Sequence, residues 1–289
     1  MTEPRLEVKK TYKLYIGGAF PRSESGRSYV VTSAAGGFLA NAAWASRKDV
    51  RDAVAAARAA QPSWSAATAY NRGQVLYRVA ELLEARRGQF IEEVRAAEGA
   101  TARRAAAQVD ASIDRWVWYA GWCDKLAQVA GSSNPVAGPY FNFSVPEPTG
   151  VIGVVAPSDS SLLGLVSVVA PALVAGNTVV ALADELRPIP AVSLTEVLAT
   201  SDVPGGVVNL LTGPPGELVP VLAAHRDVDG LDLAGAEPAL AAAAEATGAT
   251  NIKRISRPVA PGHDWRRDPG TARLLRFVET KTVWHPIGV

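Results

Sequence analysis

The sequence predicts an α/β fold in which a doubly wound, mostly parallel sheet is covered by helices. Apolar runs of strand length alternate with helix-length segments from residue 151 to residue 255. Amphipathic helical patterns occupy residues 47–126, ahead of that alternation. Hydrophobic residues make up 48% of the 289-residue chain and charged residues only 20%. These observations exclude a disordered chain and indicate one large or two modest domains with a real core.

The bulk charge and the amino terminus exclude several classes of protein. A formal net charge of +1 gives no long-range field that would attract nucleic acid or anionic lipid. The first residues lack an apolar segment followed by a cleavage site of small residues, as a secretory signal would have. The single cysteine, Cys123, forms no intramolecular disulfide. We expect a cytoplasmic protein that binds neither nucleic acid nor membranes.

The first third of the chain predicts a small β element followed by helices. The β-rich segments at residues 14–18 and 29–31 are separated by polar turn residues and are expected to pair as a hairpin. Residues 47–126 place apolar side chains at helical spacing, with no catalytic pattern of their own. We expect these helices to cover the sheet.

A turn-rich break and a strand come next. Residues 131–139 are rich in Gly, Ser and Pro, which predicts a loop. Residues 140–145 alternate between apolar and polar positions like a strand, and Pro146 and Pro148 are expected to end it.

Residues 160–183 contain no charged side chain and are long enough to cross a bilayer as a single helix. Pro171 interrupts the run, residues 176–178 have the composition of a turn, and residues 178–182 are rich in β-formers. We therefore interpret residues 150–183 as a buried strand, helix and strand rather than as a membrane span.

The alternation continues to residue 255 and then stops. We expect helices at 189–200, near 216–224 and at 238–247, and strands at 207–211, 228–233 and 252–255. Residues 256–271, rich in Pro, Gly and Arg, are expected to form a linker with little core of its own. Residues 277–284 alternate between apolar and polar positions like a strand. A terminal strand of this kind needs a sheet edge to pair with.

Several separate phrases resemble the aldehyde dehydrogenase superfamily, in the order in which that family has them. They are YIGG (15–18), YAGW (119–122), VIGVVAP (151–157), APALVAGNTVV (170–180), PGGVVN (204–209) and ETKTVW (279–284). The resemblance covers nearly the whole chain and implies a Rossmann-like coenzyme-binding domain with a β oligomerisation arm.

The resemblance also suggests a division of the chain. Residues 1–137 would form the hairpin and helical part of the coenzyme domain, and residues 151–255 its Rossmann-like part. Residues 138–150 and 274–289 would be the arm strands, and residues 256–273 a linker in place of the family's catalytic domain. We therefore identify the chain as a truncated and degenerate member of the superfamily.

The position of the family's oxyanion-stabilising asparagine is occupied by Asp159. An ionised carboxylate donates no hydrogen bond and repels a developing negative charge, and losing one such donor costs ~10²–10³ in rate. Asp159 is therefore a poor oxyanion residue, and with Ser160 and Ser161 it is an equally good candidate for a helix N-cap.

The cofactor positions implied by the resemblance are only partly retained. Glu185 matches the family's ribose-binding glutamate, and Gly213 and Gly235 match glycines of its cofactor loops. The matching lysine and the pyrophosphate-binding serine are absent, because Leu182 and Ala236 stand at those positions. We expect no bound cofactor, and NAD, if it binds at all, to bind weakly through Glu185, Gly213 and Gly235.

Catalytic and metal-binding residues are absent from the expected positions. Residues 252–274 include no glutamate that could act as the family's general base, and no cysteine follows Cys123. Cys123 lies on an apolar helix and is best interpreted as a buried core thiol. His225, His263 and His285 lack metal-ligand spacing, so no metal is expected.

The retained strands suggest a partner. The segments from Phe141 to Val145 and from Phe277 to Trp284 resemble the arm that docks on a neighbouring subunit's catalytic domain. We hypothesise a catalytically inactive subunit that assembles with a full-length aldehyde dehydrogenase through this arm. One alternative is NAD-dependent aldehyde oxidation completed in trans. Another is a free-standing nucleotide binder, which the acidic side chains of Asp159, Asp184 and Asp232 disfavour.

Overall fold

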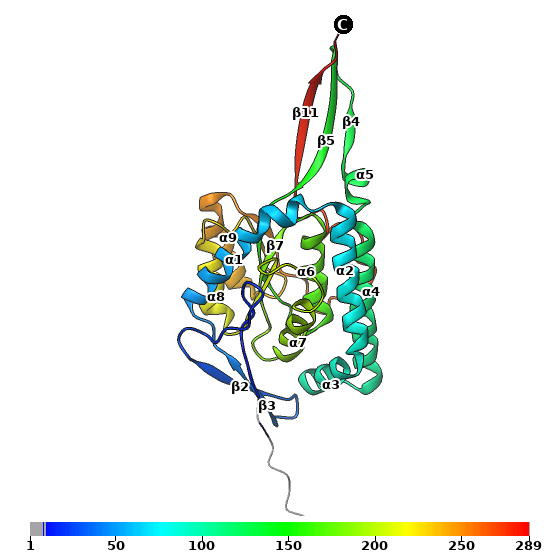
Figure 1. The fold of residues 1–289 in the computed structure, drawn as a ribbon. Helices are drawn as coiled ribbons and strands as arrows, with labels where there is room; N and C mark the ends of the chain where they lie inside the picture. The colour runs from blue at the N-terminus through cyan, green and yellow to red at the C-terminus, as the bar shows by residue number, and fades with distance from the viewer. Residues whose placement is uncertain (1–7, 9, 289) are drawn as a thin grey trace, which may run out of the picture.

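The centre of the molecule is a five-stranded parallel sheet. The computed structural model describes residue 8 and residues 10–288 (Figure 1). The strands lie in the order β10-β9-β6-β7-β8, so the chain winds outwards from β6 in one direction and then in the other. This confirms the predicted doubly wound sheet. The strands are β6 (Val151–Val155), β7 (Thr178–Leu182), β8 (Val208–Leu211), β9 (Gly230–Asp232) and β10 (Arg254–Ser256).

Helices cover both faces of this sheet. One apolar core joins the sheet to α2, α3, α4, α6 and α7, and a second joins it to α1, α8 and α9. Figure 1 shows the two groups on opposite sides of the molecule. The helices are α1 (Arg47–Ala66), α2 (Ala69–Ala85), α3 (Arg87–Glu98), α4 (Ala102–Trp122), α5 (Leu126–Ala130), α6 (Leu163–Val174), α7 (Ile189–Leu198), α8 (Pro215–Ala224) and α9 (Pro238–Gly248), with a short 3₁₀ turn at Ala249–Asn251.

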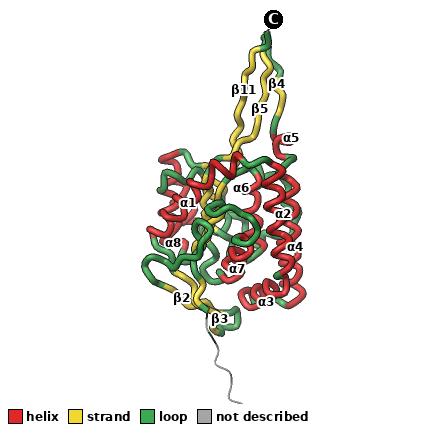
Figure 2. Tube along the Cα trace, in the orientation of Figure 1, coloured by secondary structure: helices red, strands yellow, loops and turns green. Residues whose placement is uncertain are grey.

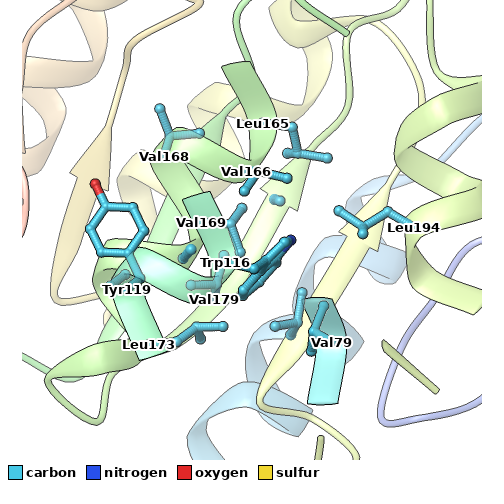
Figure 3. Close-up of a cluster of buried hydrophobic side chains, with 14 of the residues drawn as sticks. Val79, Trp116, Tyr119, Leu165, Val166, Val168, Val169, Leu173, Val179 and Leu194 are labelled. Atoms are coloured by element: carbon cyan, nitrogen blue, oxygen red, sulfur yellow. The ribbon is translucent and has the colours of Figure 1, made fainter. Parts of the chain in front are cut away.

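The uncharged stretch forms the strand, helix and strand expected of it. All residues of α6 are buried, because β6 and β7 lie against one side of the helix and α4 packs on another. Figure 3 shows the Trp116 ring surrounded by apolar side chains that include Val169, Leu173 and Val179. Within the described part of the chain, no helix combines the length and the apolar character that a bilayer crossing needs.

The predicted hairpin between residues 14–18 and 29–31 is wrong. Residues Ser28–Thr32 (β2) pair instead with Phe38–Ala43 (β3), and β3 also pairs with the short strand Thr11–Tyr12 (β1). Tyr15 exchanges two backbone hydrogen bonds with Leu210 of β8, at 2.9 and 2.8 Å. The apolar side chains of Tyr15 and Leu14 are therefore buried in the first and the second apolar core, respectively, rather than in a local hairpin.

A second sheet projects from the body as an arm. It consists of β4 (Ser132–Asn134), β5 (Tyr140–Pro148) and β11 (Val278–Pro286), in the order β11-β5-β4. Figures 1 and 2 show β5 and β11 extending well beyond the helices. In antiparallel register, Val278 lies opposite Pro148 and Pro286 opposite Tyr140.

Two expectations for this region need correction. The Gly- and Pro-rich break contains β4, which pairs with Asn142 to Ser144 of β5. Strand β5 also continues through Pro146 to Pro148 instead of ending there. Beyond Ser144, β5 is paired only with β11 among the described residues. Proline is tolerated there because one side of the strand has no ladder to lose.

Candidate functional site: the carboxyl edge of the sheet

Ligands of open α/β sheets bind where the strand order reverses, outside the carboxyl ends of the strands. Here the reversal lies between β6 and β9. The loops after β6, β7, β8 and β9 carry Asp159, Glu185, Gly213 and Gly235 in turn. The structure therefore places all four predicted positions along the same edge of the sheet.

Gly235 brings the loops after β6 and β9 into backbone contact. Its amide donates a hydrogen bond to the Val155 carbonyl at 3.0 Å. A Cβ atom at this position would lie 1.9 Å from the carbonyl oxygen of Ala156, which no side chain permits. The protein's own packing is thus sufficient to require glycine here.

Gly213 and Glu185 lie apart from this contact. Gly213 has φ +136°, and a Cβ there would lie 3.3 Å from the Ala45 amide, so the loop after β8 packs against the segment before α1. Glu185 lines a separate cleft of about 440 Å³ that includes Tyr29 and Ala97. The three predicted cofactor positions share an edge, but they do not form one cavity.

Asp159 contacts a side chain that the sequence does not suggest. Its Oδ1 accepts a hydrogen bond from the indole Nε1 of Trp265 at 3.0 Å. Of the three residues considered as N-cap candidates, Ser160 and not Asp159 bonds an amide of α6. Ser160 Oγ accepts the Gly164 amide in the first turn, at 3.0 Å, and donates to Gln108.

We call residues 257–277 the strap, because they connect β10 to β11 across the carboxyl ends of β6 and β9. The Val259 amide donates to the Ala234 carbonyl at 3.2 Å, which attaches the strap to the loop after β9. The side chains of Trp265, Leu274 and Phe277 are buried in the main core. The segment expected to be a linker therefore has no separate core, yet it completes the core of the domain.

A buried arginine of helix α4 also bonds the backbone of the strap. Arg115 of α4 donates to the backbone carbonyls of Trp265 at 2.8 Å and Arg267 at 3.0 Å, and to Ser167 Oγ at 3.1 Å. Because Arg115 is only 7% exposed, these bonds compensate for the loss of water around its guanidinium. A cleft of about 600 Å³ remains between the strap, Asp159 and α4.

A second arginine comes from the strap itself. Arg273 donates to Oδ2 of Asp232, whose side chain is fully buried at the end of β9. Burial raises the pKa of Asp232, and the guanidinium of Arg273 opposes that rise. The Tyr119 hydroxyl lies in the same region, where burial raises its pKa to about 12, and it points away from the apolar cluster in Figure 3.

The loop after β7 contains a further acidic residue whose pKa is shifted. Burial raises the pKa of Asp184 to about 6, although its Oδ1 accepts the Arg187 amide at 2.8 Å. The Arg187 guanidinium donates to the carbonyl of Ser158, which ties the loops after β6 and β7 together. The crevice at β6 and β9 is thus occupied by the strap, by Asp159 and Asp232, and by the guanidiniums of Arg115 and Arg273, all of which already bond groups of the same chain.

The remaining candidate residues offer no nucleophile or metal centre in this part of the molecule. Cys123 is buried, as expected, and burial raises the pKa of its thiol to about 12. Such a thiol is not a nucleophile at neutral pH. Among residues 8 and 10–288, no cluster of three or more His, Cys, Asp or Glu side chains is arranged to hold a metal ion.

Sequence reasoning missed the residues that close this edge, namely Arg115, Trp265 and Arg273. The only available signal was composition: a tryptophan in a Pro- and Gly-rich segment is unusual for a solvated linker. Nothing in the order of residues pairs Trp265 with Asp159.

Comparisons with known proteins agree with this architecture. The model of the Aldehyde dehydrogenase family matches residues 20–258. Human Retinal dehydrogenase 2 is 33% identical over 259 residues, covering 88% of this chain and 49% of the relative. The chain thus spans about half the length of the curated relatives that it matches.

Solved structures give the same result. HpcC from Thermus thermophilus superposes with a TM-score of 0.81 at 31% identity, covering 86% of this chain and 48% of that one. The NAD+ complex of an aldehyde dehydrogenase from Bacillus cereus gives a TM-score of 0.80 at 25% identity, covering 85% and 50%. The chain therefore belongs to the aldehyde dehydrogenase family.

Proposed function

We propose that this protein is a non-catalytic subunit that assembles with a full-length aldehyde dehydrogenase as its structural or regulatory partner. The observation that carries the proposal is the path of the chain between β10 and β11. Only the strap lies between these strands, and it closes the carboxyl edge of the sheet with the chain's own side chains.

The chemistry at this edge supports a non-catalytic role. Asp159 already accepts the Trp265 indole, and its carboxylate offers no donor to an oxyanion. The thiol of Cys123 is buried on α4 and is held protonated by its surroundings. Neither group is placed to attack an aldehyde or to stabilise the product of that attack.

The arm supports assembly with another chain. Phe141, Phe143 and Val283 share one face of the arm, since alternate residues of a strand point the same way and Val283 lies opposite Phe143. The Phe141 side chain is 49% exposed at the far end of the sheet, and its ring lies 5.4 Å from that of Phe143. A projecting apolar face of this kind is typical of a protein interface.

A full-length dehydrogenase fits this face better than a second copy of the chain. By the resemblance, the family's arm docks on the catalytic domain of a neighbouring subunit. The described residues contain no such domain, so two copies lack the reciprocal receptor of an ordinary two-fold dimer. The outer edge of β11 has no paired strand within residues 8 and 10–288, and it can receive a strand from the partner.

Co-expression with each full-length aldehyde dehydrogenase of the source organism tests the proposal. We expect one of them to co-purify with the chain and to elute with it at the combined mass in size-exclusion chromatography with light scattering. Phe141→Asp should weaken this association about 30-fold or more, because it places a charge in the apolar contact. Tyr70→Asp, on the exposed face of α2, is the matched control and should leave the association unchanged.

Two outcomes would contradict the proposal. One is a monomer that ignores every full-length dehydrogenase. The other is tight binding of NAD to the isolated chain in a calorimetric titration, which would favour an enzyme whose activity is completed in trans.

A further inference from the structure

A buried carboxylate ends strand β9. The Asp232 side chain is 0% exposed, and its Oδ1 accepts the Ala234 amide at 3.1 Å. Its other oxygen accepts the Arg273 guanidinium. Without that second contact, one oxygen of a fully desolvated carboxylate would lack a cationic partner, which is strongly unfavourable.

The surroundings of this pair are those of a site built for a planar cation. The Arg273 guanidinium lies 5.6 Å from the centre of the Trp265 ring, within the range of a cation–π contact. Trp265 is fixed in turn by Asp159 and by Arg115. The Arg273 side chain is only 17% exposed, so the guanidinium is enclosed by its partners.

A buried hydroxyl borders the same place. It belongs to Tyr119, and it lies close to the Arg115 guanidinium. Arg115 and Arg273 are the positive groups near it, and Asp232 is the negative one. The cluster therefore combines a carboxylate, an aromatic face and a nearby hydroxyl around the Arg273 guanidinium.

We propose that the crevice at the ends of β6 and β9 is a guanidinium-binding site, filled in cis by Arg273 of the strap. Its ligand class is an alkylguanidinium, such as an arginine side chain, and not a nucleotide phosphate. A guanidinium is planar and can lie over an aromatic ring while one of its N–H groups bonds a carboxylate, so such a site favours it over an ammonium ion of equal charge. This inference does not depend on assembly with a partner.

Chemical rescue of a cavity variant tests the site. In Arg273→Ala the guanidinium is deleted while Asp232 and Trp265 remain, and the thermal midpoint should fall. Methylguanidinium chloride at tens of millimolar should raise that midpoint by about 3 °C or more through binding to the folded state. Methylammonium chloride at the same concentration should raise it much less.

The control variant is Arg267→Ala, because the Arg267 side chain is exposed on the same strap. Neither this control nor the wild type should be stabilised by methylguanidinium. Equal shifts in all three proteins, or no shift in Arg273→Ala, would overturn the proposal.

A second variant keeps the test decisive if Arg273→Ala does not fold. The double variant Asp232→Asn with Arg273→Ala replaces the carboxylate by an amide that needs no cation. It should fold, and it should not respond to methylguanidinium. A double variant as unstable as the single one, or one that is still rescued, would contradict the assignment.

Discussion

The carboxyl edge of the central sheet and the projecting arm differ in what their side chains contact. At the carboxyl edge, Asp159, Asp232 and the Arg115 guanidinium are all bonded to the strap of the same chain. On the arm, Phe141 and Trp284 remain 49% and 58% exposed. The edge is closed by the chain itself, whereas the arm presents apolar surface that the chain does not cover.

This difference indicates which end depends on another molecule. Ligand-binding edges of α/β sheets normally stay open, and projecting apolar surfaces are typical of protein interfaces. In this protein the strap closes the carboxyl edge, while β5 and β11 extend from the body as a long arm. The comparison supports our proposal that the arm carries the interaction and that the edge has a structural role.

The largest expected effect comes from comparing the loss of a tryptophan in each of the two regions. Trp265→Ala should lower the free energy of unfolding by about 3–5 kcal/mol, because a buried indole that also bonds Asp159 is lost. Trp284→Ala, on the arm, should cost less than about 1 kcal/mol in the isolated chain. Urea denaturation measures both, and equal losses would break the comparison.

A smaller effect is expected where the loops after β6 and β9 touch. Gly235→Ala should destabilise the protein by about 2–3 kcal/mol, since the added methyl group collides with the Ala156 carbonyl. The control is Gly216→Ala in α8, where a Cβ meets no atom within 4 Å. That control should be neutral or stabilising by up to ~1 kcal/mol. A tolerated Gly235→Ala would mean that this glycine is not needed for packing.

The smallest effect concerns pH. The folded-state pKa of Asp184, about 6, lies above its ordinary value of 3.8, so the folded state holds the proton more tightly. This contribution to stability is present below about pH 4 and is lost as the pH rises towards 6 and beyond. Asp184→Asn should therefore be more stable than the wild type by roughly 1–2 kcal/mol at pH 7 and no more stable at pH 4. Parallel denaturation curves at the two pH values measure this, and a gain that is the same at both would contradict it.

Much of the sheet was predictable because its central strands are buried on both faces. The runs at β6 and β7 are continuous and apolar, which is how a parallel strand reads in a sequence. Strand β3 was missed because FLANAA has little β-propensity, and its position is set by pairing with both β1 and β2. Strands β5 and β11 of the arm were predicted by alternation, although β5 extends further than its prolines suggested, whereas β4 lies in a segment predicted to be a loop.

The candidate site was predictable only to the level of the edge. Glu185, Gly213 and Gly235 lie there, and their role in cofactor binding stays a prediction. The bonds of Asp159 to Trp265 and of Asp232 to Arg273 join residues that are far apart in the chain. Such pairs depend on which loops the strand order brings together, and no local pattern encodes them.

Hydrogen–deuterium exchange of the chain, alone and with the full-length dehydrogenase that co-purifies with it, tests the central claim most directly. Slower exchange in the partner's presence should be confined to β5 and β11, with the strap and the loops after β6 and β9 unchanged. Protection at the strap or the carboxyl edge, with none on the arm, would contradict the account.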